Sequence, residues 1–175
     1  LDLGIESSNG SLGHGISMAV GIALAAKKQE KSFKTYTLLG DGETNEGSVW
    51  EAIMLASHLK LDNLTAIVDY NKQQNDGFGK DVLHIKNMAE RFRAFGWHVI
   101  EINGHDMNEI VQAFEAAPLE QPKAIIAHTV KGKGVSFMEG NNEWHHNRLT
   151  KTSYEAAVVS LDDSNYDRKD HGNNT

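Results

Sequence analysis

The chain has 175 residues, a formal net charge of −7 and no cysteine. This length suffices for one domain with a hydrophobic core, but not for two large ones. The lack of cysteine excludes disulfides and thiolate metal sites, and the acidic balance without a dense basic cluster argues against a nucleic-acid partner. No apolar run approaches the ~20 residues of a membrane-spanning helix. We therefore expect no membrane partner and a cytoplasmic location.

The first half of the chain alternates helical and strand-like segments. Small and apolar residues over 13–28 predict a helix that packs closely under a sheet, and residues 33–39 predict a strand that ends at Gly-Asp-Gly. A helix over 46–59 follows, then a buried strand over 64–69 and a glycine-containing loop over 72–80. This alternation is typical of an α/β fold whose strands run parallel.

The second half repeats the pattern and then loses it. Its expected elements are a helix over 85–95, a strand over 97–102, a helix over 107–116 and a strand over 123–129. We expect a three-layer fold, with a parallel sheet covered by helices on both faces, in a domain over 1–150. Residues 151–175 are expected to hold a short helix (153–160) and, from 162, a mobile polar tail.

Two of the predicted strands end at residues that can bind a hard cation. Asp41 follows the strand over 33–39, and Asn71, which is 30 residues further on, follows the strand over 64–69. Such a spacing fits one strand–helix–strand unit, whose strands end at the same edge of a parallel sheet. A carboxylate and an amide oxygen can hold Mg²⁺ and leave coordination positions open for phosphate oxygens.

Glycines and a helix start complete the predicted site. Gly40 and Gly42 flank Asp41, which permits a sharp turn and the close approach of a phosphate to backbone N–H groups. The helix that begins near Glu46 would present its positive end to the same place. The sequence therefore predicts a diphosphate held through a divalent cation.

The residues of the predicted site lie in sequence motifs that resemble those of a known family. Gly40-Asp41-Gly42, followed by Glu46-Gly47 and later by Asn71, resembles the thiamine diphosphate motif. The glycine-rich segment over 10–17 looks like the start of a helix in transketolases. The stretch over 42–52 is similar to the amino-terminal subunit of split bacterial transketolases. The similarity extends from about residue 3 to residue 145, and it implies the diphosphate-binding (PP) domain of that family, incomplete at its N-terminus.

The resemblance implies a role for several residues. The cation, Mg²⁺ or Ca²⁺, would be bound by Asp41, by the side-chain carbonyl of Asn71 and by the backbone carbonyl of Gln73. Gly42 would donate its N–H to the diphosphate, with Gly40 beside it.

Further family positions would surround the cofactor. Gly10 and Leu12 match positions that line the cofactor beside its rings. Glu46 matches a family glutamate near the subunit interface and belongs to the expected cofactor-binding set. His145 matches a catalytic histidine that contacts the diphosphate or the substrate, although the neighbouring His146 is an alternative for this role.

The resemblance also implies a partner chain. Nothing in the sequence matches the family's pyrimidine-binding domain, so a C-terminal transketolase subunit or section would complete the active site, in a dimer or a dimer of heterodimers. The reaction would transfer a two-carbon ketol unit from a ketose phosphate to an aldose phosphate, as in the pentose phosphate pathway of carbohydrate metabolism.

Three alternatives remain open from the sequence. Asn75 stands where the family usually has an apolar residue, which favours a transketolase-like enzyme for an unusual sugar. A deoxyxylulose phosphate synthase is a second alternative, against which Ser11-Leu12-Gly13 argues. A third is a non-catalytic domain of the same fold that binds a partner chain.

Overall fold

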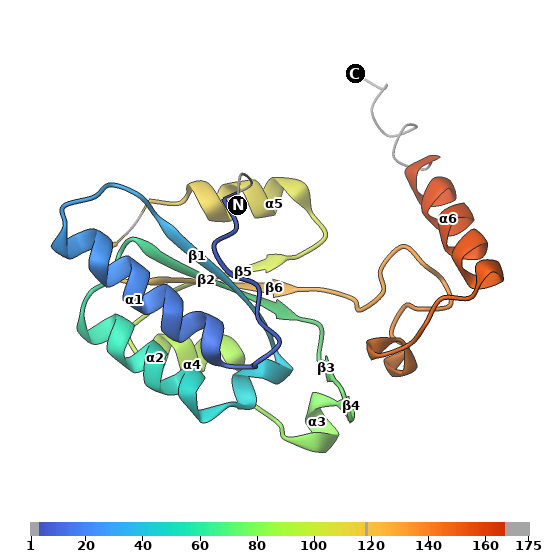
Figure 1. Ribbon diagram of the computed structural model, residues 1–175, viewed down its shortest axis with the longest axis horizontal. Helices are drawn as coiled ribbons and strands as arrows, with labels where there is room; N and C mark the ends of the chain where they lie inside the picture. The colour runs from blue at the N-terminus through green and yellow to red at the C-terminus, as the bar shows by residue number, and fades with distance from the viewer. Residues whose placement is uncertain (1–3, 118, 167–175) are drawn as a thin grey trace.

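A four-stranded parallel sheet forms the centre of the computed structural model, which describes residues 4–117 and 119–166. Its strand order is β1-β2-β6-β5, and all three neighbouring pairs are parallel (Figure 1). The strands are β1 (Thr35–Gly40), β2 (Leu64–Tyr70), β5 (His98–Asn103) and β6 (Lys123–His128). The predicted α/β fold with a parallel sheet is confirmed.

Helices cover both faces of this sheet, as predicted. One face carries α1 (His14–Lys28), α2 (Gly47–His58) and α4 (Met88–Ala94). The other face carries α5 (Met107–Glu115), so that Figure 1 shows three layers. Of these four helices, α1, α2 and α5 lie within two residues of their expected ranges, whereas α4 does not.

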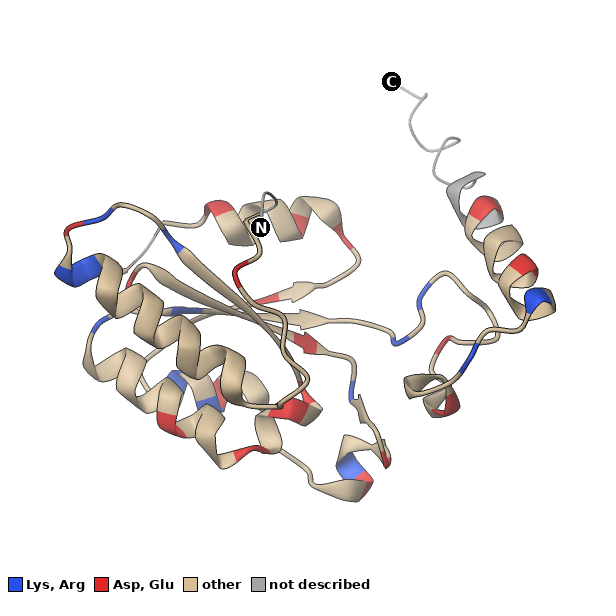
Figure 2. Cartoon of the chain, in the orientation of Figure 1, with Lys and Arg blue, Asp and Glu red and all other residues tan. Residues whose placement is uncertain are grey.

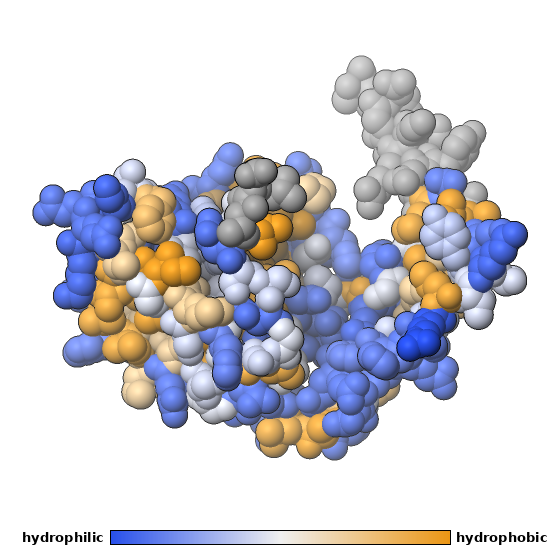
Figure 3. Space-filling model, viewed as in Figure 1, coloured by the Kyte–Doolittle hydropathy of each residue, from blue (hydrophilic) through white to orange (hydrophobic). Residues whose placement is uncertain are grey.

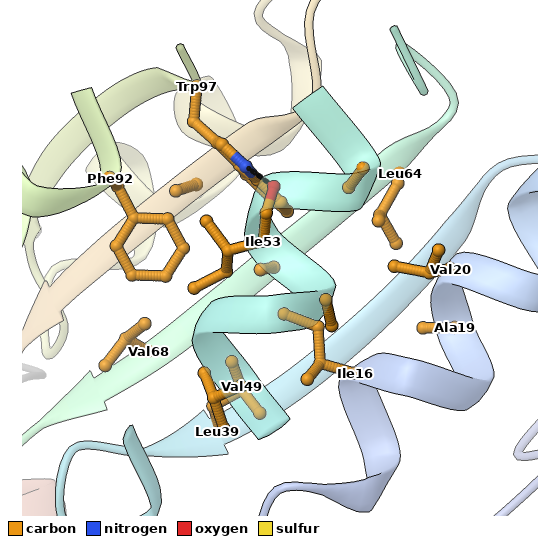
Figure 4. Packing of buried hydrophobic residues seen from close by; sticks show 14 of the residues in the cluster. Ile16, Ala19, Val20, Leu39, Val49, Ile53, Leu64, Val68, Phe92 and Trp97 are labelled. Atoms are coloured by element: carbon orange, nitrogen blue, oxygen red, sulfur yellow. Dashed lines mark hydrogen bonds between the residues drawn. The ribbon is translucent and has the colours of Figure 1, made fainter. Parts of the chain in front are cut away.

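The main core lies between the sheet and the three-helix layer (Figure 4). Ala19 and Ala23 of α1 are buried, and their small side chains let this helix approach the sheet closely. Phe92 and Trp97 fill the space beside α2 with their rings 5.4 Å apart. The indole N–H of Trp97 donates to the backbone carbonyl of Ile53 at 2.9 Å, so the large ring is buried without an unpaired donor.

The opposite face has a smaller core and leaves part of the sheet uncovered. Ile102, Ala113 and Ile125 pack between the sheet and α5. On edge strand β1, Tyr36 contacts Phe114 of α5 but is still 48% exposed, and Leu38 is 71% exposed. One helix is too narrow to cover four strands.

The segment after β2 differs from its prediction as a loop over 72–80. It contains a short hairpin of β3 (Gln73–Gln74) and β4 (Gly77–Phe78), followed by the one-turn helix α3 (Gly79–Val82). Helix α4 begins at Met88 rather than at residue 85, because the side chain of Asn87 caps it by accepting the N–H of Glu90 at 3.1 Å.

The C-terminal region contains a 3₁₀ turn, η2 (Asn142–His145), and helix α6 (Lys151–Tyr166), which stands away from the sheet in Figure 1. The predicted helix over 153–160 was therefore too short, and the tail expected from 162 is helical as far as 166. The rest of that tail lies outside the described residues. Within the described ranges, the structure contains no helix with the length and apolar character needed to traverse a bilayer.

Candidate functional site

The two predicted cation ligands lie on neighbouring strand ends. Strands β1 and β2 are paired so that Gly40 is opposite Asp69, which places Asp41 and Asn71 at the same edge of the sheet. Both residues line one cavity of about 450 Å³, together with Gly42 and Gln73. In Figure 2, the red that marks acidic residues appears at the ends of both strands. This juxtaposition agrees with the prediction from the spacing of Asp41 and Asn71.

The carboxylate of Asp41 connects the two strand ends. Its Oδ1 accepts the N–H of Gly42 at 2.8 Å, and its Oδ2 accepts the N–H of Lys72, across the edge, at 2.5 Å. Asp41 is only 9% exposed. Each carboxylate oxygen still has a free acceptor position, so the group can bind a cation without losing these contacts.

The charge on this carboxylate is poorly compensated by the protein. Burial raises the pKa of Asp41 to about 6, while the N–H groups of Lys72 and Gly42 act in the opposite direction and nearby Asp69 raises the pKa further. Within residues 4–117 and 119–166, Asp41 forms no ion pair. A divalent cation would supply the missing positive charge.

Hydrogen bonds fix the orientation of the Asn71 amide. Its Nδ2 donates to Asp69 Oδ2 at 3.3 Å, and its Oδ1 accepts the N–H of Gln73 at 2.9 Å. Asp69 is itself held by the hydroxyl of Thr129 from the segment after β6. Asp69 was not among the predicted site residues, although its place near the end of a buried strand was a signal in the sequence.

Gln73 uses its side chain for a purpose that the sequence did not suggest. The residue is 6% exposed, and its Nε2 donates to the carbonyl of Gly140 at 2.9 Å. This contact attaches the segment before η2 to the hairpin, as does the bond from Asn142 Nδ2 to the carbonyl of Asn75 at 3.0 Å. The backbone carbonyl of Gln73 remains the predicted ligand.

A 3₁₀ turn, η1 (Gly42–Asn45), separates Asp41 from α2. It is held by the hydroxyl of Thr44, which donates to the carbonyl of Asp41 at 2.5 Å, and by Trp50, whose indole N–H donates to the carbonyl of Thr44 at 2.7 Å. The turn, and not the first residues of α2, therefore follows Asp41 directly.

Contact with β3 gives a further reason for glycine at position 42. A Cβ on Gly42 would lie 2.6 Å from the Cβ of Gln74, so β3 is too close for any side chain. Its N–H, which the resemblance assigns to a diphosphate, donates to Asp41 in this structure.

Other predicted residues lie outside the lining of this cavity. Gly10 and Glu46 are exposed, and Leu12 is 54% exposed. Gly40 ends β1 and donates its N–H to Glu43.

The expected catalytic histidine lies on η2, beyond the hairpin. His145 is exposed and does not line the cavity. Partial burial lowers its pKa, as do the charges of Lys131 and His146, while Asp76 acts in the opposite direction. These influences favour the neutral imidazole.

The donor set fits a hard cation. No group of three or more histidine, cysteine, aspartate or glutamate side chains suited to a metal occurs in the part of the chain that the structure describes. The predicted set differs from such a group, because it combines one carboxylate, one amide oxygen and one backbone carbonyl. Oxygen ligands of this kind are those that Mg²⁺ and Ca²⁺ prefer.

A second hollow, of about 500 Å³, lies between the sheet edge and α6. Figure 3 shows it on the visible face. Lys131 and Lys133 line it together with His105, whose ring accepts the N–H of Val130 at 2.8 Å. It adjoins the first cavity, because Asn71 lines both.

The fold and the site at this edge of the sheet are those of a known protein family. Residues 1–161 match the family model described as the thiamine diphosphate binding domain of transketolase. This match covers most of the chain, so the chain belongs to that family.

Particular relatives can be named. The chain is 48% identical over 157 residues to one of the subunits of the apulose-4-phosphate transketolase of Phocaeicola vulgatus, a match that covers 89% of this chain and 56% of that protein. It is 45% identical over 162 residues to the 6-deoxy-6-sulfo-D-fructose transketolase subunit SqwG of a Clostridium species, covering 91% of this chain and 59% of that protein. The chain thus spans little more than half the length of these relatives.

A solved structure agrees with the family. The transketolase of Campylobacter jejuni superposes with a TM-score of 0.84 and 38% sequence identity, over 91% of this chain and 26% of that one.

Proposed function

We propose that this chain binds thiamine diphosphate through a divalent cation and supplies the diphosphate half of the active site of a two-chain transketolase. The observation that carries the proposal is the position of Asp41 and Asn71 on adjacent strand ends, where both line one cavity with Gln73. The family of the chain supports the cofactor, and the oxygen donor set supports Mg²⁺.

The proposed tasks of the residues come from the family resemblance, and the cavity that Asp41, Asn71 and Gln73 share supports them. Asp41, the amide oxygen of Asn71 and the backbone carbonyl of Gln73 hold the cation, and Gly42, which lines the same cavity, faces the phosphate oxygens. Bound thiamine diphosphate supplies the nucleophilic carbon and the electron sink for ketol transfer. The protein contributes position and fixed charge.

The predicted residues that do not line the cavity have proposed roles as well. Gly10, Leu12 and Glu46 would contact the cofactor or the partner chain, which fits their exposure in this chain. His145 would face the diphosphate or the substrate from η2. Its neutral imidazole could then accept a proton or a hydrogen bond.

A partner chain is part of the proposal. Both relatives named above are called subunits, and this chain spans little more than half of each. Leu38 and Tyr36 on β1 leave apolar surface exposed that further protein can cover. We propose a dimer or a dimer of heterodimers with a chain that carries a pyrimidine-binding domain, and residues 1–150 as the diphosphate-binding unit.

An uncommon sugar is the substrate class that the relatives favour. They are named for apulose-4-phosphate and for 6-deoxy-6-sulfo-D-fructose. The polar Asn75 supports the same inference, since its position is usually apolar in the family. Assays of several donor ketoses with the partner chain present would separate an uncommon donor from the common pentose and hexose phosphates.

The test of the site is Asp41→Ala, with Asp81→Ala on α3 as the control, because Asp81 is an exposed aspartate outside the cavity. Calorimetry should show Mg²⁺-dependent thiamine diphosphate binding in the wild type and in the control, but not in Asp41→Ala. Circular dichroism should show that all three are folded.

Ligand-induced stability provides a second measurement. A ligand at 100 times its dissociation constant stabilises the folded state by ~2.7 kcal/mol. The melting temperature is measured for the chain by itself and for its complex with the partner chain. If Mg²⁺ and thiamine diphosphate change neither value, the non-catalytic alternative is correct.

A further inference from the structure

Glu43 joins two glycine-rich segments that are distant in the sequence. Its Oε1 accepts the N–H of Gly13 at 2.9 Å, and its Oε2 accepts the N–H of Gly40 at 3.1 Å. Gly13 immediately precedes α1, and Gly40 is the last residue of β1. One carboxylate therefore connects the start of the first helix to the turn that carries Asp41.

The position of Gly13 is fixed from several sides. Its φ of 80° is in the left-handed region that favours glycine, and its carbonyl accepts the hydroxyl of Ser48 at 3.3 Å. A Cβ at this position would lie 2.5 Å from Ser48 Oγ and 2.8 Å from Glu46 Cβ. The segment before α1 is thus pressed against the start of α2 and held by both its N–H and its carbonyl.

Glu43 also caps the N-terminus of α1, which has no side-chain cap of its own. Helix α1 has no side-chain N-cap and no acidic residue in its first turn. Carboxylates near a helix N-terminus stabilise the unpaired N–H groups there, and here the carboxylate comes from a different element. Glu43 does not line the cavity beside Asp41.

We propose that Glu43 is a positioning residue, which locks the segment over 10–13 to the turn over 40–42 and so fixes the position of Gly10 and Leu12 relative to Asp41 before ligand binds. This inference rests on the proposed function, which places both segments at thiamine diphosphate. Asp41 directly follows Gly40, so Glu43 holds the backbone beside the proposed cation ligand. Fixing such groups in advance raises affinity, because less order must be created on binding.

The substitution Glu43→Gln tests this link with little change in shape. Glutamine has one acceptor oxygen and an NH₂ group that cannot accept an N–H, so one of the two glycine contacts must be lost. Glu109→Gln is a matched control. Glu109 accepts the N–H of Asn103 at the end of β5 at 2.7 Å, outside the cavity.

Two measurements on the whole chain separate the link from the proposed function. Amide hydrogen exchange, followed residue by residue without ligand, should show about tenfold faster exchange at Gly13 or Gly40 in Glu43→Gln, but unchanged exchange at both in Glu109→Gln. Calorimetry with Mg²⁺ and thiamine diphosphate should give a dissociation constant about tenfold larger for Glu43→Gln, with a wild-type value for Glu109→Gln.

Each outcome has a definite meaning. Unchanged exchange at both glycines in Glu43→Gln would overturn the link itself. Faster exchange with wild-type affinity would overturn its role in positioning. Absence of ligand binding by the wild type would overturn the proposed function, and the exchange data would then still decide whether the link exists. If Glu43→Gln does not fold, Glu43→Asp provides the same comparison, because aspartate keeps the charge but is one methylene shorter, so we expect it to lose one of the two glycine contacts.

Discussion

At the scale of single residues, the buried carboxylate of Asp41, which we propose binds the cation, destabilises the folded chain when no ligand is bound. It is buried beside Asp69, has two backbone N–H donors and forms no ion pair among the described residues, and the charge of Lys131 is the smallest influence on its pKa. A group of this kind is more stable when protonated or when bound to a cation. This arrangement is typical of a ligand-binding site.

A dependence of stability on pH follows from Asp41. Its folded-state pKa of about 6 lies above the ordinary 3.8, so the native chain binds more protons in this window. The stabilising contribution is fully present below about pH 3.8 and is lost as the pH rises through 6. Without metal, the free energy of unfolding of the wild type, relative to Asp41→Asn, should fall by roughly 2 kcal/mol between pH 4 and 7, with allowance for partial solvent screening.

Urea unfolding at a series of pH values would measure this difference. Asp81→Asn should follow the wild type across the range. A constant difference between the wild type and Asp41→Asn would contradict the prediction.

At the scale of elements, Lys123 connects β6 to α5. The residue is 7% exposed, and its Nζ donates to the carbonyls of Ala113, Phe114 and Ala116 at 2.7, 3.1 and 3.2 Å. A buried ammonium at the C-terminus of a helix satisfies carbonyls that have no partner within the helix. Burial lowers the pKa of Lys123, with a further contribution from Lys34.

Replacing this lysine should therefore destabilise the fold. Lys123→Met keeps the length of the side chain but removes three hydrogen bonds, and we expect a loss of about 2 kcal/mol in the free energy of unfolding. Lys151→Met on α6, where the side chain is 89% exposed, should change it by less than about 0.5 kcal/mol. Equal effects in chemical denaturation would show that Lys123 does not hold α5.

At the scale of the whole molecule, the site is open and the sheet is only partly covered. The hairpin β3–β4 and the turn η2 are joined by Gln73 and Asn142, whereas α6 stands away from the sheet. These features agree with a chain that contributes one part of a larger assembly.

Metal removal tests the assembly. Ketol transfer, followed as loss of the donor ketose, should require the partner chain, disappear when EDTA removes the cation, and return when Mg²⁺ is added. In the proposed site the cation joins the diphosphate to Asp41, so chelation should also abolish thiamine diphosphate binding. Transfer activity by this chain alone would contradict the two-chain proposal, and activity that resists EDTA after dialysis would contradict the role of the metal.

The alternation of elements could be predicted from the residues alone, and with it the parallel sheet and the meeting of Asp41 and Asn71 at one edge. Hydrophobic period and glycine positions are local properties, and strand–helix–strand units place successive strand ends together. The hairpin within 72–80 was missed because its two-residue strands are too short to show a period. The late start of α4 was missed because it depends on the cap at Asn87.

The groups that support the site became visible only in the folded chain. Glu43 contacts Gly13 from 30 residues away, Asp69 orients Asn71 with help from Thr129, and Gln73 holds Gly140. None of these contacts leaves a pattern along the chain, because each joins segments that approach one another only when the sheet and its helices have packed. The sequence specifies the elements through local periodicity, whereas the pairing of their polar groups depends on distances that folding alone creates.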